Sequence, residues 1–136
     1  MIKIDLYIKE YDWDLTFLFK ANRLIAAVEN LLFNRNCPFS IVSEALRTIL
    51  HINTGFCYTN YYLKSTLICV AETDSEEELV NTAVHELKHF QSHVCEYYEV
   101  DEKSEEAAYL IGDTTGKLYK EAKRLCGQIL NKRLIR

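Results

Sequence analysis

Residues 75–95 have the sequence SEEELVNTAVHELKHFQSHVC and contain the clearest structural signal in the chain. Ser75 followed by Glu78 is the capping-box pattern of a helix N-terminus, and the two glutamates between them add negative charge to the first turn. We therefore predict a helix from Ser75 to about Cys95. Its apolar residues fall within an arc of roughly 80° and should form the packing face: Leu79, Ala83, Leu87, Phe90 and Val94.

The chain before this helix alternates between strand and helix patterns. Residues 2–8 alternate apolar and polar side chains, and residues 13–19 are β-prone and can pair with them as a hairpin, although a helix start competes there. Apolar spacings of three and four predict one helix from Asn22 and another from about Pro38, which ends at residues 53–55. Two β-prone runs, residues 56–62 and 65–71, predict a second hairpin.

A last helix is predicted after the central one. Ser104 can cap it, and Gly112 and Gly116 weaken its continuity unless another backbone packs closely against them. The apolar positions of this helix include Ala108, Ile111, Leu118, Ala122, Leu125 and Ile129. The whole pattern predicts an α+β fold in which a small β-sheet packs on helices.

Length and charge limit the classes of protein that fit the chain. Its 136 residues, 49% of them hydrophobic, can bury one core, so we predict a single domain over residues 1–136. The formal charge of −4 disfavours a phosphate backbone, and no nucleic-acid partner is expected. The short basic cluster near the C-terminus suits a helix-end dipole better: Lys132, Arg133 and Arg136.

Cysteine usage and hydropathy bear on location. The five cysteines contain no C-x-x-C pair, which suits a reducing compartment better than a disulfide framework. Acidic residues interrupt the N-terminal apolar run, and no other segment approaches 18 apolar residues. The chain is therefore expected to be cytoplasmic, without a membrane partner.

The residues with the strongest chemical signal are His85, Glu86 and His89, which form an H-E-x-x-H sequence inside the predicted helix. The two histidines lie roughly 40° apart around the axis and one turn apart along it, so both imidazoles can reach one zinc ion. Glu86 on the adjoining edge can act as a general base toward water on that metal. The alternative is a solvated helix that carries two histidines and a glutamate by chance.

A catalytic zinc usually takes a third protein ligand. His93 lies about 12 Å along the axis from His85, too far for all three histidines to bind one ion, and the same objection applies to Cys95. His51 is isolated in sequence. Glu105 and Glu106 follow after a connection that can reverse the chain, and Glu105 is favoured because Tyr109, one turn later, can hydrogen-bond the metal site. Both glutamates are alternatively ordinary acidic residues at a helix start.

Two segments carry a family resemblance. Residues 81–89, NTAVHELKH, and residues 105–113, EEAAYLIGD, resemble the small gluzincin-type (HExxH plus Glu) zinc metallopeptidases of bacteriophages and gut-bacterial mobile elements, and residues 53–60, NTGFCYTN, add a weaker match. The resemblance implies a minimal zincin-like domain. In that domain His85, His89 and a glutamate of the later helix would bind zinc and Glu86 would be the base.

Two classes of function remain open at the level of the sequence. The first is a zinc metallopeptidase acting on a peptide or protein, with a homodimer or protein partner completing the substrate cleft of so short a chain. The second is a non-catalytic zinc-binding or protein-interaction protein of a phage or mobile element. A phenol just before the motif helix could stabilise an oxyanion in the first class, although packing roles are expected more often: Tyr58, Tyr61 and Tyr62.

Overall fold

The structure of the chain, a computed structural model, describes the backbone of residues 2–135 and the side chains of residues 2–125. The predicted roles of Ile129 and of the basic residues Lys132, Arg133 and Arg136 lie outside the described side chains. Within the described residues, four cysteines are free thiols: Cys37, Cys57, Cys69 and Cys95.

Four strands and four helices make up the fold, with two short 3-10 turns. The strands are β1 (Ile2–Ile8), β2 (Trp13–Phe19), β3 (Gly55–Asn60) and β4 (Ser65–Val70). The helices are α1 (Ile25–Phe33), α2 (Phe39–Ile49), α3 (Glu76–Tyr98) and α4 (Glu105–Ile135), and the 3-10 turns are η1 (Lys9–Tyr11) and η2 (Ala21–Arg23). Every predicted element is confirmed, and the α+β class with them.

The strands form one mixed sheet in the order β1-β2-β4-β3. Both predicted hairpins are confirmed, since β1 pairs antiparallel with β2 and β3 pairs antiparallel with β4. A parallel pairing of β2 with β4, in which Asp14 lies opposite Ser65, joins the two hairpins. The sheet therefore ends in β1 on one side and in β3 on the other.

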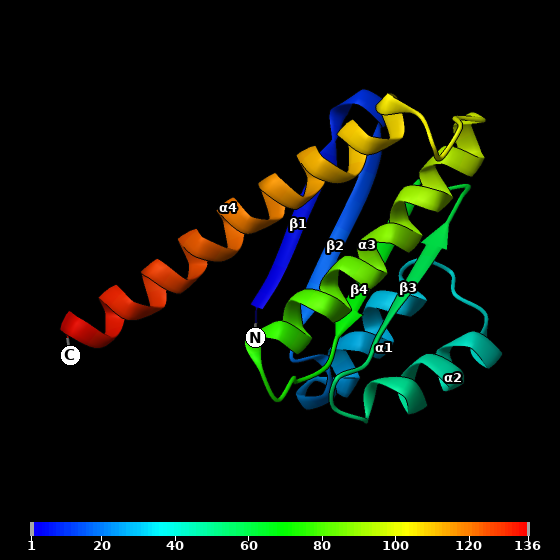
Figure 1. Cartoon of the computed structure of the whole chain (residues 1–136). Helices are drawn as coiled ribbons and strands as arrows, with labels where there is room; N and C mark the ends of the chain where they lie inside the picture. The colour runs from blue at the N-terminus through cyan, green and yellow to red at the C-terminus, as the bar shows by residue number, and fades with distance from the viewer. Residues whose placement is uncertain (1, 136) are drawn as a thin grey trace.

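Helices cover both faces of the sheet (Figure 1). Successive side chains of the central strands point to opposite faces, so both faces carry apolar side chains that pack against helices. On β2, Phe17 packs in the core beneath α3 and α4, whereas Leu18 packs in the core beneath α1 and α2. On β4, Ile68 packs in the core beneath α3 and α4, and Leu67 packs in the core beneath α1 and α2. Each helical layer thus has its own apolar core.

The helix α3 carries the HExxH residues and is fixed at its start as predicted. The N–H of Glu78 donates to the Ser75 hydroxyl at 3.1 Å. The helix continues past the predicted end at Cys95 and ends at Glu99, which adopts the left-handed conformation (φ 56°). Ser104 caps α4 by accepting from the N–H of Ala107 at 3.2 Å.

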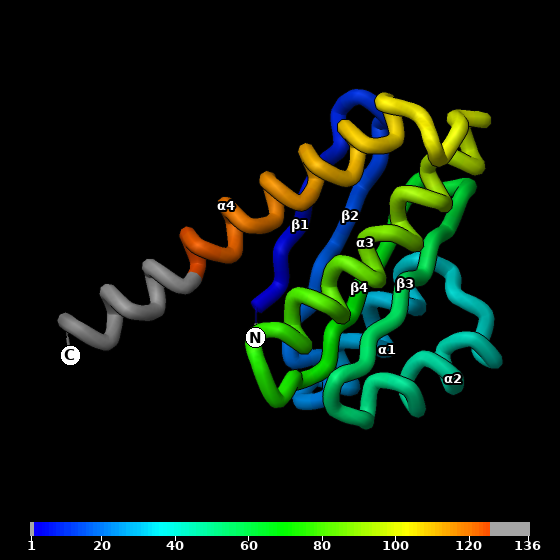
Figure 2. Tube along the Cα trace, in the orientation of Figure 1, coloured from blue at the N-terminus to red at the C-terminus, as the bar shows by residue number. Residues whose placement is uncertain are grey.

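The helices α3 and α4 lie close to each other at the connection that joins them and diverge toward the other end of the sheet (Figure 2). The packing face predicted for α3 is confirmed, with Leu87, Phe90 and Val94 buried in the core that α4 shares through Leu110 and Leu118. No helix in the described part of the chain combines the length and the apolar character needed to cross a bilayer.

Candidate metal centre

The two histidines of the motif converge on one point beside α3. The Nε2 atoms of His85 and His89 lie 3.2 Å apart, and both side chains are exposed. Two nitrogens bound to one tetrahedral zinc, at bond lengths of 2.0–2.1 Å, lie about 3.3–3.4 Å apart. The rings meet at 74° and their centroids lie 4.9 Å apart. This geometry fits two of the ligands of a zinc ion.

Glu86 lies next to the histidines but points into the protein, where it is only 5% exposed. It packs against the first residue of β3, because a Cβ built on Gly55 would lie 3.2 Å from Cγ of Glu86. Burial raises the pKa of the Glu86 carboxyl above its ordinary value, and the nearby His85 and His89 oppose that shift. A carboxyl with a raised pKa beside two histidines has the properties of a general base.

A shallow pocket of about 320 Å³ opens beside this group. Residues of α2, of the turn before β3 and of α3 line it: Thr48, Asn53, Thr54, Gly55, Asn81, Thr82, His85 and Glu86. The sequence predicts a helix end at residues 53–55 and includes them in the weaker family match over residues 53–60, but it predicts no role in the site for them. The signal that could have found them is the glycine, which permits close approach of the motif helix to the sheet.

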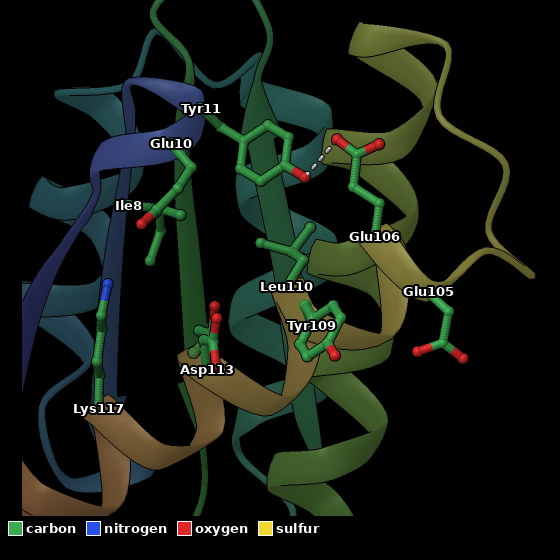
Figure 3. Close-up of a pocket in the computed structure, with 10 residues that line it drawn as sticks. Ile8, Glu10, Tyr11, Glu105, Glu106, Tyr109, Leu110, Asp113 and Lys117 are labelled. Carbon is green, nitrogen blue, oxygen red and sulfur yellow. Dashed lines mark hydrogen bonds between the residues drawn. The ribbon is translucent and has the colours of Figure 1, made fainter.

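The structure does not bring Glu105, Glu106 or Tyr109 to the histidine pair. These residues line a different pocket of about 470 Å³ between η1 and α4 (Figure 3). Glu106 accepts a hydrogen bond from the Tyr11 hydroxyl at 3.0 Å, whereas Glu105 points away from that hydroxyl. Burial and this bond raise the pKa of Tyr11 to about 12. Tyr109 is 66% exposed and makes no hydrogen bond with either glutamate.

The orientation of α3 explains this separation. Gln91 faces α4, since its Nε2 donates to the carbonyl oxygen of Ala107 at 2.7 Å. At about 100° per residue, His85 and His89 lie roughly 120–160° around the helix axis from Gln91. The pair therefore faces away from α4, and the described residues contain no group of three His, Cys, Asp or Glu side chains that could hold a metal ion.

The remaining candidate ligands lie apart from the pair. His93 is half-buried between α3 and β3, where its Nδ1 lies 2.7 Å from the Thr59 hydroxyl oxygen. Burial lowers its pKa, and the charge of His89 contributes to that shift. His51 is exposed after α2, and Cys95 is buried in the protein.

The tyrosines considered for oxyanion stabilisation occupy three different environments. Tyr58 is half-buried, and the Tyr61 hydroxyl donates to Glu96 at 3.2 Å. Tyr62 is 94% exposed. None of the three lines the pocket beside Glu86.

Comparison of the chain with protein-family models, with curated proteins and with solved structures gives no match.

Proposed function

We propose that the chain is a zinc-dependent metallopeptidase with a zincin-like architecture, in which His85 and His89 bind the metal and Glu86 is the general base. One observation carries this proposal: the Nε2 atoms of the two histidines lie 3.2 Å apart, close to the spacing of two nitrogens on one tetrahedral zinc. The buried carboxylate of Glu86, which lies between them in the sequence, supplies a base beside the two proposed metal ligands.

Glu86 performs the proton transfers in this proposal. Zinc, when bound, supplies Lewis-acid activation of water and of the scissile carbonyl. The Glu86 carboxylate takes a proton from the attacking water and returns it to the leaving amine. Its raised pKa favours the first step, because a stronger base accepts the proton more readily, and the more basic leaving amine takes the proton in the second step.

The position of β3 supports a peptide as the substrate. This strand pairs with β4 on one side only, so its other edge has backbone groups available to an extended chain. Contacts between α3 and β3 place this strand beside the helix that carries the histidine pair. A peptide added along β3 would therefore lie beside the proposed metal ligands.

The third ligand separates this proposal from a second one. Glu105 remains the predicted third ligand. Binding of zinc by Glu105 together with the histidine pair would require the first turn of α4 to move relative to α3. The absence of a third donor next to the pair in the described residues favours the second candidate, a non-catalytic zinc-binding or protein-interaction protein. In that case a donor from another molecule completes the site.

Metal analysis tests the proposal directly. Protein purified without added metal and then reconstituted should hold about one zinc per chain. A His89→Ala variant should lose it, whereas His51→Ala, a matched control at an exposed histidine outside the pair, should retain it. Equal zinc content in wild type and His89→Ala would show that the site does not exist.

Catalysis is tested separately with Glu86→Gln. This variant should bind zinc as wild type does and should lose cleavage of a casein or peptide-library substrate, because the amide keeps the shape but is no base. Zinc binding by wild type without any such cleavage supports the non-catalytic candidate instead.

A further inference from the structure

The pocket beside Glu86 has a rigid wall formed by residues 53 and 54. Asn53 adopts the left-handed conformation (φ 60°), and its N–H donates to the carbonyl oxygen of Glu72 at 2.9 Å. The Thr54 hydroxyl lies 2.9 Å from the Thr48 carbonyl oxygen, which connects the same turn to the end of α2. This wall is held in place by the protein before any ligand arrives, which lowers the entropic cost of binding.

The side-chain amide of Asn53 has a defined orientation. Its Oδ1 accepts a hydrogen bond from the backbone N–H of Asp74 at 3.0 Å. No hydrogen bond to another described residue engages its Nδ2 group. Asn53 lines the pocket, and its two side-chain N–H donors are free of hydrogen bonds to the described residues.

Two residues of α3 form a second part of the pocket wall and add polar groups to it. The amide of Asn81 is exposed, and the hydroxyl of Thr82 belongs to a side chain that is only 8% exposed. Within the described part of the chain neither side chain makes a hydrogen bond. The two walls together offer both donors and acceptors, in the neighbourhood of Glu86.

The charge of the lining restricts the ligand further. No Lys, Arg or Asp lines the pocket, and its two ionisable groups, His85 and Glu86, are already used in the proposed reaction. An anionic or a cationic side chain would therefore lose water without gaining a dedicated ion pair, which is unfavourable. An uncharged side chain with donors and acceptors suits these walls best.

We propose that this pocket binds the carboxamide side chain of a substrate glutamine or asparagine, with Asn53, Asn81 and Thr82 as the residues that determine specificity. A carboxamide has one acceptor oxygen and two N–H donors, which complement the donors and acceptors of the walls. The volume of about 320 Å³ is at the small end for ligand pockets and suits one side chain. As a subsite beside the cleaved bond, it rests on the proposed peptidase function.

An NMR titration tests the pocket without requiring catalysis. The probes are N-acetyl amino-acid N-methylamides of glutamine, asparagine, leucine, glutamate and lysine, added to metal-free protein. The glutamine or asparagine probe should shift the side-chain amide resonances of Asn53 and Asn81 saturably. The leucine, glutamate and lysine probes should bind more weakly.

Variants locate the effect. Asn81→Leu should weaken binding of the better carboxamide probe by about 2- to 10-fold, the size expected from one hydrogen bond. Thr82→Val should act in the same direction, whereas Asn30→Leu, at an exposed asparagine on the other helical layer, should bind as wild type does. The absence of saturable shifts, equal affinity for the leucine probe, or unchanged affinity in both pocket variants would overturn the proposal.

This design separates the two proposals. Loss of the peptidase hypothesis, shown by absent zinc binding or absent cleavage, leaves the probe titration valid as a test of the pocket. Zinc-dependent cleavage with no saturable probe binding would instead retain the peptidase and remove the carboxamide subsite.

Discussion

The Nδ1 atom of His93 lies 2.7 Å from the hydroxyl oxygen of Thr59, at the end of a buried chain of hydrogen bonds. The Trp13 indole donates to the Thr66 hydroxyl at 2.9 Å, and the Thr66 and Thr59 hydroxyl oxygens lie 2.7 Å apart. An indole N–H can only donate. Each hydroxyl proton makes a hydrogen bond when the Thr66 hydroxyl donates to Thr59 and the Thr59 hydroxyl donates to Nδ1 of His93. Nδ1 is then an acceptor, so the proton of the neutral ring is on Nε2.

We therefore expect His93 to be neutral with the proton on Nε2, which ¹⁵N chemical shifts of the ring measure directly. Thr59→Val removes the donor to Nδ1 and should produce a mixture of tautomers, whereas Thr115→Val, at an exposed helical threonine, should change nothing. A ring protonated on Nδ1 in the wild-type protein would contradict the direction of the chain.

The lowered pKa of His93 gives a pH dependence with a defined sign. The charged and titratable groups around its ring are His89, Glu96, Glu102, the Cys57 thiol and the Tyr61 phenol, and burial is the largest cause of the shift. Because the unfolded chain binds this proton more strongly, the free energy of unfolding should decrease as the pH falls from about 6.5 through the folded pKa. The measurement is urea unfolding of wild type and His93→Gln across that range, and the variant should lack this contribution.

Gly55 should tolerate no side chain. A Cβ there would lie 2.9 Å from the carbonyl oxygen of Cys69 and 3.0 Å from Cγ2 of Thr82, so α3 or β4 must move. We expect Gly55→Ala to lower the free energy of unfolding by about 1–3 kcal/mol, the usual size of an overpacking penalty. Urea unfolding checks this value.

Gly112→Ala is the matched control for that substitution. Nothing lies within 4 Å of a Cβ at Gly112, which lies inside α4. The substitution should raise the free energy of unfolding by about 0.5–1 kcal/mol through helix propensity. Stabilisation by both alanines would show that α3 does not approach β3 closely.

Glu86→Gln should stabilise the metal-free protein at neutral pH. The folded pKa of Glu86 is raised by burial, so the folded chain binds the proton more strongly than the unfolded chain does. That contribution is fully present below about 4.5 and is lost as the pH rises through the folded pKa. The difference in free energy of unfolding between variant and wild type should therefore increase from acidic to neutral pH, and a constant difference would contradict the burial of a charged Glu86.

The elements of the fold could be predicted because local patterns determine them. Alternation over Ile2–Ile8 and the Ser75 cap depend on neighbouring residues only, and both predictions are confirmed. The parallel pairing of β2 with β4 could not be predicted in this way, since 45 residues separate the ends of these strands (65 − 19 − 1). Hydrophobic packing on α1 and α2 establishes that long-range contact.

The candidate site likewise has one part that local sequence determines and one part that depends on long-range packing. The spacing of His85 and His89 on one helix already implies that they meet, because four residues are about one turn. The position of Glu105 depends instead on how α4 packs against α3, and Gln91 and Leu110 determine that packing. The angle between two packed helices cannot be predicted from a sequence motif on one of them.

The two glutamates at the start of α4 differ in their contacts. Glu106 is held by the Tyr11 hydroxyl, whereas Glu105 makes no hydrogen bond with the described residues and is exposed. Of the two, Glu105 is therefore the one whose carboxylate is available to a metal.

We expect zinc affinity to fall strongly in Glu105→Ala, by about 10- to 100-fold in Tyr109→Phe, and little in Glu106→Ala. Competition with a chromogenic chelator measures the affinities. Since ligation by Glu105 requires the first turn of α4 to move toward the histidine pair, zinc should also shift the backbone amide resonances of residues 104–109 in wild type but not in Glu105→Ala.

Glu106→Ala should release Tyr11 and lower its pKa from about 12 toward the ordinary value, because the carboxylate that accepts from its hydroxyl is gone. Wild-type zinc affinity in Glu105→Ala would show that His85 and His89 bind the metal without this carboxylate, and would favour a site completed by another molecule.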